Sequence, residues 1–138
     1  MRHELADIVR SPIGDILGRT IIWGLIGGFC FYVIRTWYRW ARSDRRLSPP
    51  RWRSAMATLG FAVSTVSLLV IVILGMHALF TGGFPYYSPP LMLAFRVGFL
   101  TALSGLLAGL IGRGPLERPT IVSSLICLLI WFVTGLAQ

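Results

Sequence analysis

Apolar residues run through this chain in four long stretches, separated by short polar or turn-forming segments. The stretches cover about residues 20–38, 55–80, 91–111 and 119–136. A helix needs roughly 20 apolar residues to cross a bilayer, and no Asp, Glu, Lys or Arg occurs from residue 54 to residue 95. The pattern therefore predicts an all-α, polytopic helical membrane protein with four spans in one domain, residues 1–138.

The connectors between the stretches are short and rich in turn-forming residues. They read SDRRLSPPRWRS (43–54), TGGFPYYSPP (81–90) and GRGPLER (112–118). Short connections favour antiparallel neighbours, which predicts an up-down-up-down bundle. The charge-free core of the first stretch, from Thr20 to Ile34, is only 15 residues long. If this segment were re-entrant or lay in the membrane plane, the chain would have three spans.

Composition agrees with a membrane protein, because the mean hydropathy is +0.73 and only 13% of residues are charged, against about a quarter in soluble chains. Charged residues before the first stretch, without an A-x-A-like site, do not fit a cleavable signal. Cys30 and Cys127 both lie within apolar runs and form no CxxC pair. This arrangement favours neither a metal site nor a thiol-redox site.

The formal net charge is +8, and all 13 basic residues are arginines. Such clusters beside a membrane span are typical topology signals and contacts for anionic lipid headgroups, so we expect lipid and not nucleic acid as the partner. On a helix, the arginines at 35, 39, 42 and 46 form one stripe opposite Trp37 and Trp40. The first helix should therefore continue past the membrane as a short amphipathic extension. The predicted anchor consists of Arg35, Arg39, Arg42, Arg45, Arg46, Arg51 and Arg53.

Arginine counts predict the orientation of the spans. In a four-span arrangement the N-terminal segment and the 81–96 region carry four arginines, whereas the 35–53 and 112–119 regions carry nine. The positive-inside rule places the second set in the cytoplasm. We therefore expect both termini to lie outside the cytoplasm, in what we expect to be a bacterial inner membrane.

Small residues recur every four positions in several spans. Membrane helices associate through close backbone approach at such rows. The third span carries three adjacent rows, which predicts close neighbours on more than one side, at the centre of the bundle or in an oligomer interface. We expect a homo-oligomer or a larger membrane complex. The glycines that best mark these packing faces are Gly24, Gly28, Gly98, Gly105 and Gly109.

A few polar residues could line a mouth at the side opposite the basic loop. Arg96 lies within the third span, where ionisable residues are functional candidates, although its long side chain could simply reach back to the interface. We hypothesise that it pairs with Asp15. The lone His77 could equally be a hydrogen-bonded structural residue. The candidate mouth consists of His77, Tyr86, Tyr87, Arg96 and Asp15.

Catalytic and cofactor chemistry find little support in the sequence. Ser104 lacks the glycine that precedes the serine of a nucleophile elbow, and its depth does not match that of His77. Haem ligation by a pair of histidines would need a partner for His77. The other histidine is His3, which lies far before the first apolar stretch. Four short spans resemble the small multidrug exporters, but those use a glutamate in the first span, and the four stretches contain no acid. We expect no cofactor, no metal and no enzymatic activity.

These observations favour a small integral-membrane accessory or interaction protein that assembles through small-residue helix faces. The alternative is a small transporter or channel subunit with a polar outer mouth near His77 and Arg96. A lipid-modifying enzyme would lack the residues for its chemistry.

Overall fold

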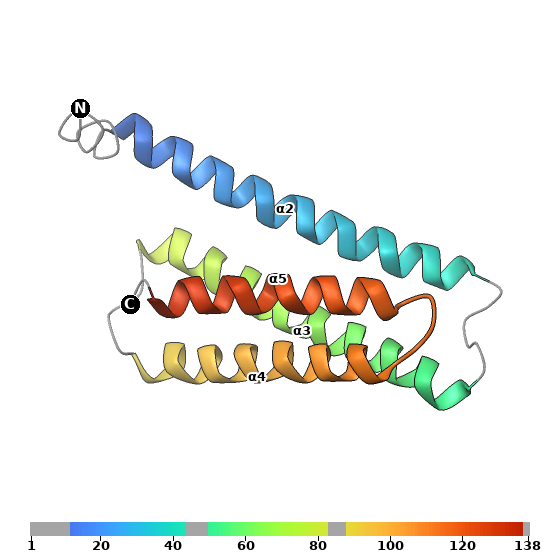
Figure 1. The fold of residues 1–138 in the computed structure, drawn as a ribbon. Helices are drawn as coiled ribbons and strands as arrows, with labels where there is room; N and C mark the ends of the chain where they lie inside the picture. Colours follow the sequence, from blue (N-terminus) through green and yellow to red (C-terminus); the bar gives the residue numbers. More distant parts are fainter. Residues whose placement is uncertain (1–11, 44–49, 83–87, 137–138) are drawn as a thin grey trace, which may run out of the picture. The chain divides into compact units, whose positions relative to one another are not determined.

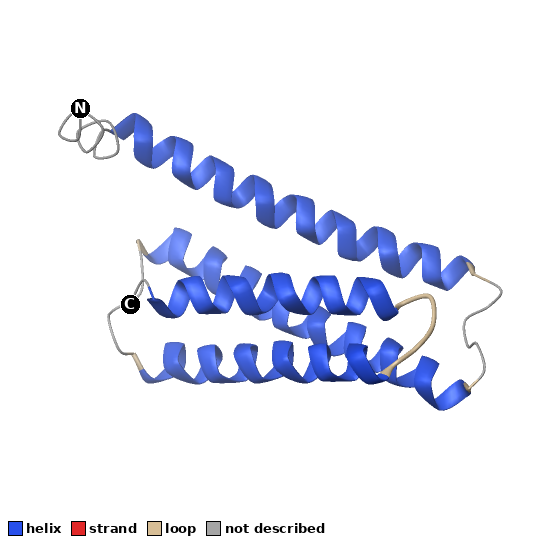
Figure 2. Cartoon of the chain, viewed as in Figure 1, coloured by secondary structure: helices blue, strands red, loops and turns tan. Residues whose placement is uncertain are grey.

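The computed structural model describes residues 12–43, 50–82 and 88–136, which are helical apart from short turns (Figure 2). Its helices are α2 (Pro12–Arg42), α3 (Arg51–Thr81), α4 (Pro89–Ile111) and α5 (Glu117–Leu136), labelled as in Figure 1. All four are long and apolar enough to cross a membrane. No strand occurs in the described ranges, so the all-α, four-span membrane fold predicted from hydropathy is confirmed.

The chain divides into two compact units, residues 1–35 and residues 36–138. We call them the N-terminal unit and the C-terminal unit. Within the described ranges the N-terminal unit consists of α2 from Pro12 to Arg35. The C-terminal unit contains the last turns of α2, from Thr36 to Arg42, together with α3, α4 and α5.

Local sequence explains where α3 and α4 begin and end. Pro50 precedes α3 in an extended conformation, and Gly82 ends it at a φ of 75°, donating its N–H to the carbonyl of Ala78. This left-handed conformation suits glycine, which has no Cβ to clash. Pro89 and Pro90 open α4, where the missing proline N–H leaves no helical bond unmade.

Two helices extend further than their apolar stretches. α2 begins at Pro12 rather than near residue 20, and α3 begins at Arg51 rather than near residue 55. A helix satisfies its own backbone hydrogen bonds and does not have to end where the hydrocarbon core ends. Charge marks the edge of the apolar stretch, whereas proline marks the start of the helix.

Helices α3, α4 and α5 pack against one another in the C-terminal unit. In Figure 1, α4 and α5 lie side by side and α3 crosses behind them. The core between them combines many small side chains with a few large ones, among them Leu68, Ile71 and Trp131. Its largest fully buried side chains are Phe61, Thr120, Cys127, Ser54, Ser64, Ser67, Ser123 and Ser124.

The last turns of α2 are joined to α3 by a tryptophan. The indole Nε1 of Trp37 donates a hydrogen bond to Thr65 Oγ1 at 3.2 Å, and the ring centroid lies 5.1 Å from that of Phe61. Arg39 and Arg42, on the other side of the helix, are exposed. α2 thus continues as an amphipathic extension, as the arginine stripe predicts.

Candidate functional site

A group of interhelical hydrogen bonds joins the three helices of the C-terminal unit. The hydroxyl oxygens of Ser64 on α3 and Ser124 on α5 lie 2.6 Å apart. Ser67 donates to the carbonyl oxygen of Gly98 on α4 at 2.9 Å, and Trp131 Nε1 donates to Ser67 Oγ at 2.9 Å. These bonds satisfy polar groups that would otherwise lie unpaired in an apolar interior.

Thr120 of α5 adds a second connection near the start of that helix. Its hydroxyl lies 3.0 Å from the carbonyl oxygen of Ala57 on α3 and 2.6 Å from that of Leu116. All the fully buried hydroxyls among the described residues of α3 and α5 take part in hydrogen bonds. The polar atoms of this core therefore hold helices together.

Glycines allow the close approach on which these bonds depend. A Cβ added to Gly105 of α4 would overlap Ser64 Oγ and would lie 2.9 Å from Ser124 Oγ. One added to Gly109 would lie 2.9 Å from Thr120 Cγ2. Gly98 lies directly against the indole of Trp131, so that no side chain fits there. The small-residue rows of α4 thus pack against α3 and α5 within the chain.

The glycines of the first span lie in a different environment. A Cβ added to Gly24, Gly27 or Gly28 would meet nothing within 4 Å. Phe31, which shares a helix face with Gly24 and Gly28, is 65% exposed. Within the N-terminal unit, no side chain covers this small-residue row of α2.

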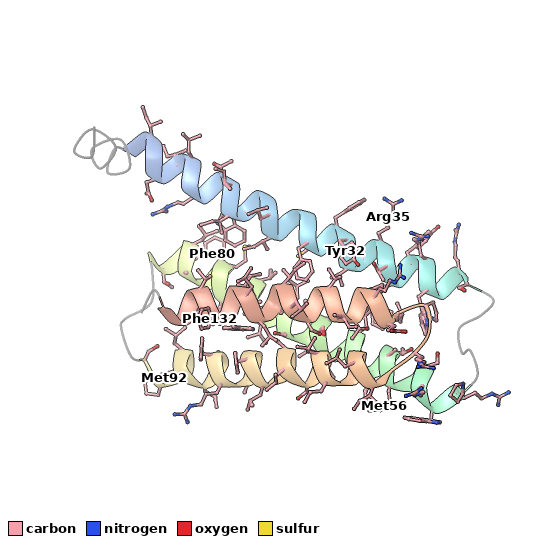
Figure 3. All side chains as sticks on the ribbon, in the orientation of Figure 1. Tyr32, Arg35, Met56, Phe80, Met92 and Phe132 are labelled. Carbon is pink, nitrogen blue, oxygen red and sulfur yellow. The ribbon has the colours of Figure 1, made fainter. Side chains whose placement is uncertain are left out.

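One end of the C-terminal unit, which we call the basic end, is rich in arginine. It is the end at which α3 begins, α4 ends and α5 begins, and nitrogen-bearing side chains gather there in Figure 3, near Met56. The backbone N–H of Arg113 donates to the carbonyl oxygen of Arg53 at 3.1 Å, joining the α4–α5 turn to the first turn of α3. The described arginines there are Arg51, Arg53, Arg113 and Arg118.

The remaining members of the predicted anchor lie on or beyond α2. Arg35 is the last residue of the N-terminal unit, whereas Arg39 and Arg42 lie in the C-terminal unit. The guanidinium of Arg42 lies 4.4 Å from the centroid of the Tyr38 ring. Arg45 and Arg46 lie outside the described residues.

The candidate polar mouth is only partly described. Tyr86 and Tyr87 lie outside the described residues. Ser67 of α3 is level with Gly98 of α4, so the exposed residues His77 and Arg96 differ in depth by about 12 Å at about 1.5 Å per residue. The ring of His77 hydrogen-bonds Thr81 within its own helix, Nδ1 to Oγ1, at 3.2 Å.

Asp15 forms an ion pair one helical turn along its own helix. Its carboxylate lies 3.2 Å from the guanidinium of Arg19, and both side chains are exposed. The pair between Asp15 and Arg96 stays a prediction. Exposed pairs of this spacing contribute about 0.3–0.5 kcal/mol, so the bond to Arg19 is a weak constraint.

The described residues offer no assembled centre for metal binding. Within ranges 12–43, 50–82 and 88–136, no three His, Cys, Asp or Glu side chains lie together as a metal site would require. Cys30 and Cys127 are free thiols. Ser104, the weak nucleophile candidate, is exposed and donates to the carbonyl of Leu100.

Sequence reasoning did not identify which core residues pair with one another, although the sequence does mark the buried faces. On α3 the small residues Gly60, Ser64 and Ser67 recur at four and three positions, and on α5 Thr120, Ser124 and Cys127 do the same. These stripes predict buried faces. They do not say which stripe meets which.

Comparison with protein-family models, with curated proteins and with solved structures found no match for the chain.

Proposed function

We propose that this chain is a small integral-membrane accessory protein, which assembles with a second copy or with a larger membrane complex through the N-terminal part of α2. The observation that carries the proposal is a contrast between two sets of glycines. Those of α4 are covered by α3 and α5, whereas nothing within the N-terminal unit covers Gly24 and Gly28 of α2. In our proposal a helix of the assembly partner packs on this row.

The physical argument rests on what drives helix association in lipid. Lipid tails are as apolar as leucine, so helices associate by close packing and not by burial of apolar area. Glycine in a helix is less favourable than alanine by about 1 kcal/mol. Glycines that recur on one face are therefore best explained by a backbone that approaches them closely.

The hydrogen-bonded core of the C-terminal unit supports an accessory role over conduction. A channel or transporter needs polar groups that face a path, whereas the buried hydroxyls of α3 and α5 bond to neighbouring helices or to their own backbone. The weak candidates for catalysis, Ser104 and His77, make hydrogen bonds within their own helices. We accordingly propose no enzymatic activity.

We further propose that the protein lies in a bacterial inner membrane with its basic end in the cytoplasm and both termini outside. The C-terminal unit supports this orientation, because Arg51, Arg53, Arg113 and Arg118 share one end. Arg96 lies near the opposite end of α4. An excess of arginine marks the cytoplasmic side of membrane helices.

Mass measurement in mild detergent tests the assembly. We expect the purified chain to form a defined oligomer or to carry a stoichiometric partner, and Gly24→Leu/Gly28→Leu to abolish either. Gly18→Leu is the matched control, because Gly18 is also open but lies about 120° away from Gly24 around the helix. Recovery of the unaltered chain only as a lone monomer would contradict the proposal.

A further inference from the structure

The basic end of the C-terminal unit combines charges that repel one another. Arg51 and Arg53 lie in the first turn of α3, which contains no acidic residue. Arg113 and Arg118 flank the start of α5, where the first turn holds a single acid, Glu117. Four positive charges thus meet one negative charge in the described part of this end.

Helix dipoles add to this positive potential. Both α3 and α5 begin here, and the N-terminus of a helix carries about half a positive charge. Acidic residues or capping side chains normally balance such an end, but Pro50 supplies no side-chain cap to α3. An anion would compensate both the dipoles and the arginines.

The backbone holds two of these arginines in a fixed relation. The N–H of Arg113 donates to the carbonyl oxygen of Arg53. Gly112 lies so close to α3 that an added Cβ would be 2.7 Å from the backbone nitrogen of Ala57. Gly114 turns the chain at a φ of 135°, and Leu116 anchors the turn with only 2% of its surface exposed.

One donor of this pair is buried without an acceptor. Nε of Arg53 has no hydrogen-bond partner among the described residues and is covered by protein atoms, so the terminal N–H groups of this guanidinium are those that could bind an anion. A buried donor on a charged group is unfavourable when it is left unpaired. A guanidinium also offers several N–H groups in a plane, which fit the oxygens of a phosphate.

The position of the basic end along the membrane normal favours a lipid headgroup as the anion. α4 and α5 are about 35 Å and 30 Å long at 1.5 Å per residue, close to the thickness of the hydrocarbon core. Because α4 ends beside Ala57, the first turns of α3 project into the headgroup layer. The guanidinium of Arg53 lies 5.4 Å from the ring centroid of Trp52, and tryptophan favours the same layer.

We propose that Arg53 and Arg113 form a binding site for the phosphate of an anionic phospholipid, with Arg51 and Arg118 around it. The site differs from a general attraction of anionic lipid to the arginines of the 35–53 region, because it joins the first turn of α3 to the α4–α5 turn. It does not depend on the assembly through α2. Gly24→Leu/Gly28→Leu should bind the lipid as the unaltered chain does.

Native mass spectrometry of the full chain in an uncharged maltoside detergent tests the site, with phosphatidylglycerol and phosphatidylcholine as probes. We expect one phosphatidylglycerol to stay bound under conditions that strip phosphatidylcholine. Arg53→Gln/Arg113→Gln should weaken that binding by about tenfold or more, as expected for loss of charged hydrogen bonds. Arg39→Gln/Arg42→Gln removes the same charge from α2 and should leave binding essentially unchanged.

Four results would overturn the proposal. The first is equal retention of both lipids, and the second is equal weakening of binding by Arg53→Gln/Arg113→Gln and Arg39→Gln/Arg42→Gln. The third is displacement of phosphatidylglycerol by inorganic phosphate, and the fourth is its displacement by an oligonucleotide that binds the same arginines. If the glutamine variant does not fold, Arg53→Lys/Arg113→Lys replaces it. This variant keeps the charge but loses the planar fork, and it should weaken binding measurably; unchanged binding would count against the site.

Discussion

The hydroxyl oxygens of Ser64 and Ser124 lie 2.6 Å apart and join α3 to α5 where both helices meet Gly105 of α4. The pair is 60 positions apart in the sequence and completely buried. Serine is small enough to permit this approach, and its hydroxyl supplies a bond that leucine could not. Close backbone packing and hydrogen bonding therefore meet at the same point of the core.

Gly105→Ala should destabilise the C-terminal unit. The added methyl group overlaps Ser64 Oγ, and overpacking of a filled core costs about 1–3 kcal/mol. Denaturant titration in detergent, followed by circular dichroism, measures the change in the free energy of unfolding. Gly18→Ala, where the methyl group meets open space, should be neutral or slightly stabilising; equal effects at both positions would contradict the packing described.

Trp131→Phe should remove the hydrogen bond to Ser67 while keeping a ring over Gly98. Interhelical hydrogen bonds in membranes contribute about 0.6 kcal/mol, and at most about 1.7 kcal/mol. In a double-mutant cycle with Ser67→Ala, the free energies of unfolding should show a coupling of at least about 0.5 kcal/mol. Trp52→Phe, at an exposed ring, is the control, and strictly additive effects of Trp131→Phe and Ser67→Ala would argue against the bond.

The hydropathy pattern predicted the helices of this chain, but not their contacts. An apolar stretch of about 20 residues is long enough to cross the bilayer, and a single segment that crosses does so as a helix, so four stretches predicted four helices. The dense small-residue rows of α4 indicated close neighbours on more than one side, and Gly98, Gly105 and Gly109 do lie against α3 and α5.

Spacing along one helix carries no information about the residue on the next helix. Ser64 has its partner on α5 and Ser67 bonds to both α4 and α5, and each pairing depends on the register of the whole bundle. For the same reason the sequence alone did not bring Arg53 and Arg113 together. Their contact follows from the close approach of Gly112 to Ala57 and from the turn at Gly114.

Gly114→Ala should strain the α4–α5 turn. A φ of 135° is unfavourable for any residue with a Cβ, and such a conformation costs about 1–3 kcal/mol. We expect a lower free energy of unfolding together with weaker binding of phosphatidylglycerol, because the turn positions Arg113 beside Arg53. Unchanged stability would mean that the turn relaxes without loss, and this would remove the argument that the two arginines are held in place.

The arginines of the 35–53 region should fix the orientation of the chain. In a chain with Cys30→Ala/Cys127→Ala, single cysteines at positions 3 and 47 should differ in labelling by an impermeant reagent applied from outside. Position 3 should react and position 47 should be protected, because arginine-rich loops stay in the cytoplasm. Replacement of Arg39, Arg42, Arg45 and Arg46 by Gln should mix or invert this pattern; an unchanged pattern would contradict the role of these arginines as an anchor.

Photo-cross-linking in the native membrane tests the central claim, assembly through α2, most directly. Phe31 lies about 20° from Gly24 around the helix, whereas Ile22 lies about 160° away, and both side chains are exposed. A benzophenone amino acid at position 31 should give one discrete adduct, with a second copy or with another membrane protein, and the same group at position 22 should not. Lipid adducts alone at both positions, or the same protein adduct at both, would contradict the claim.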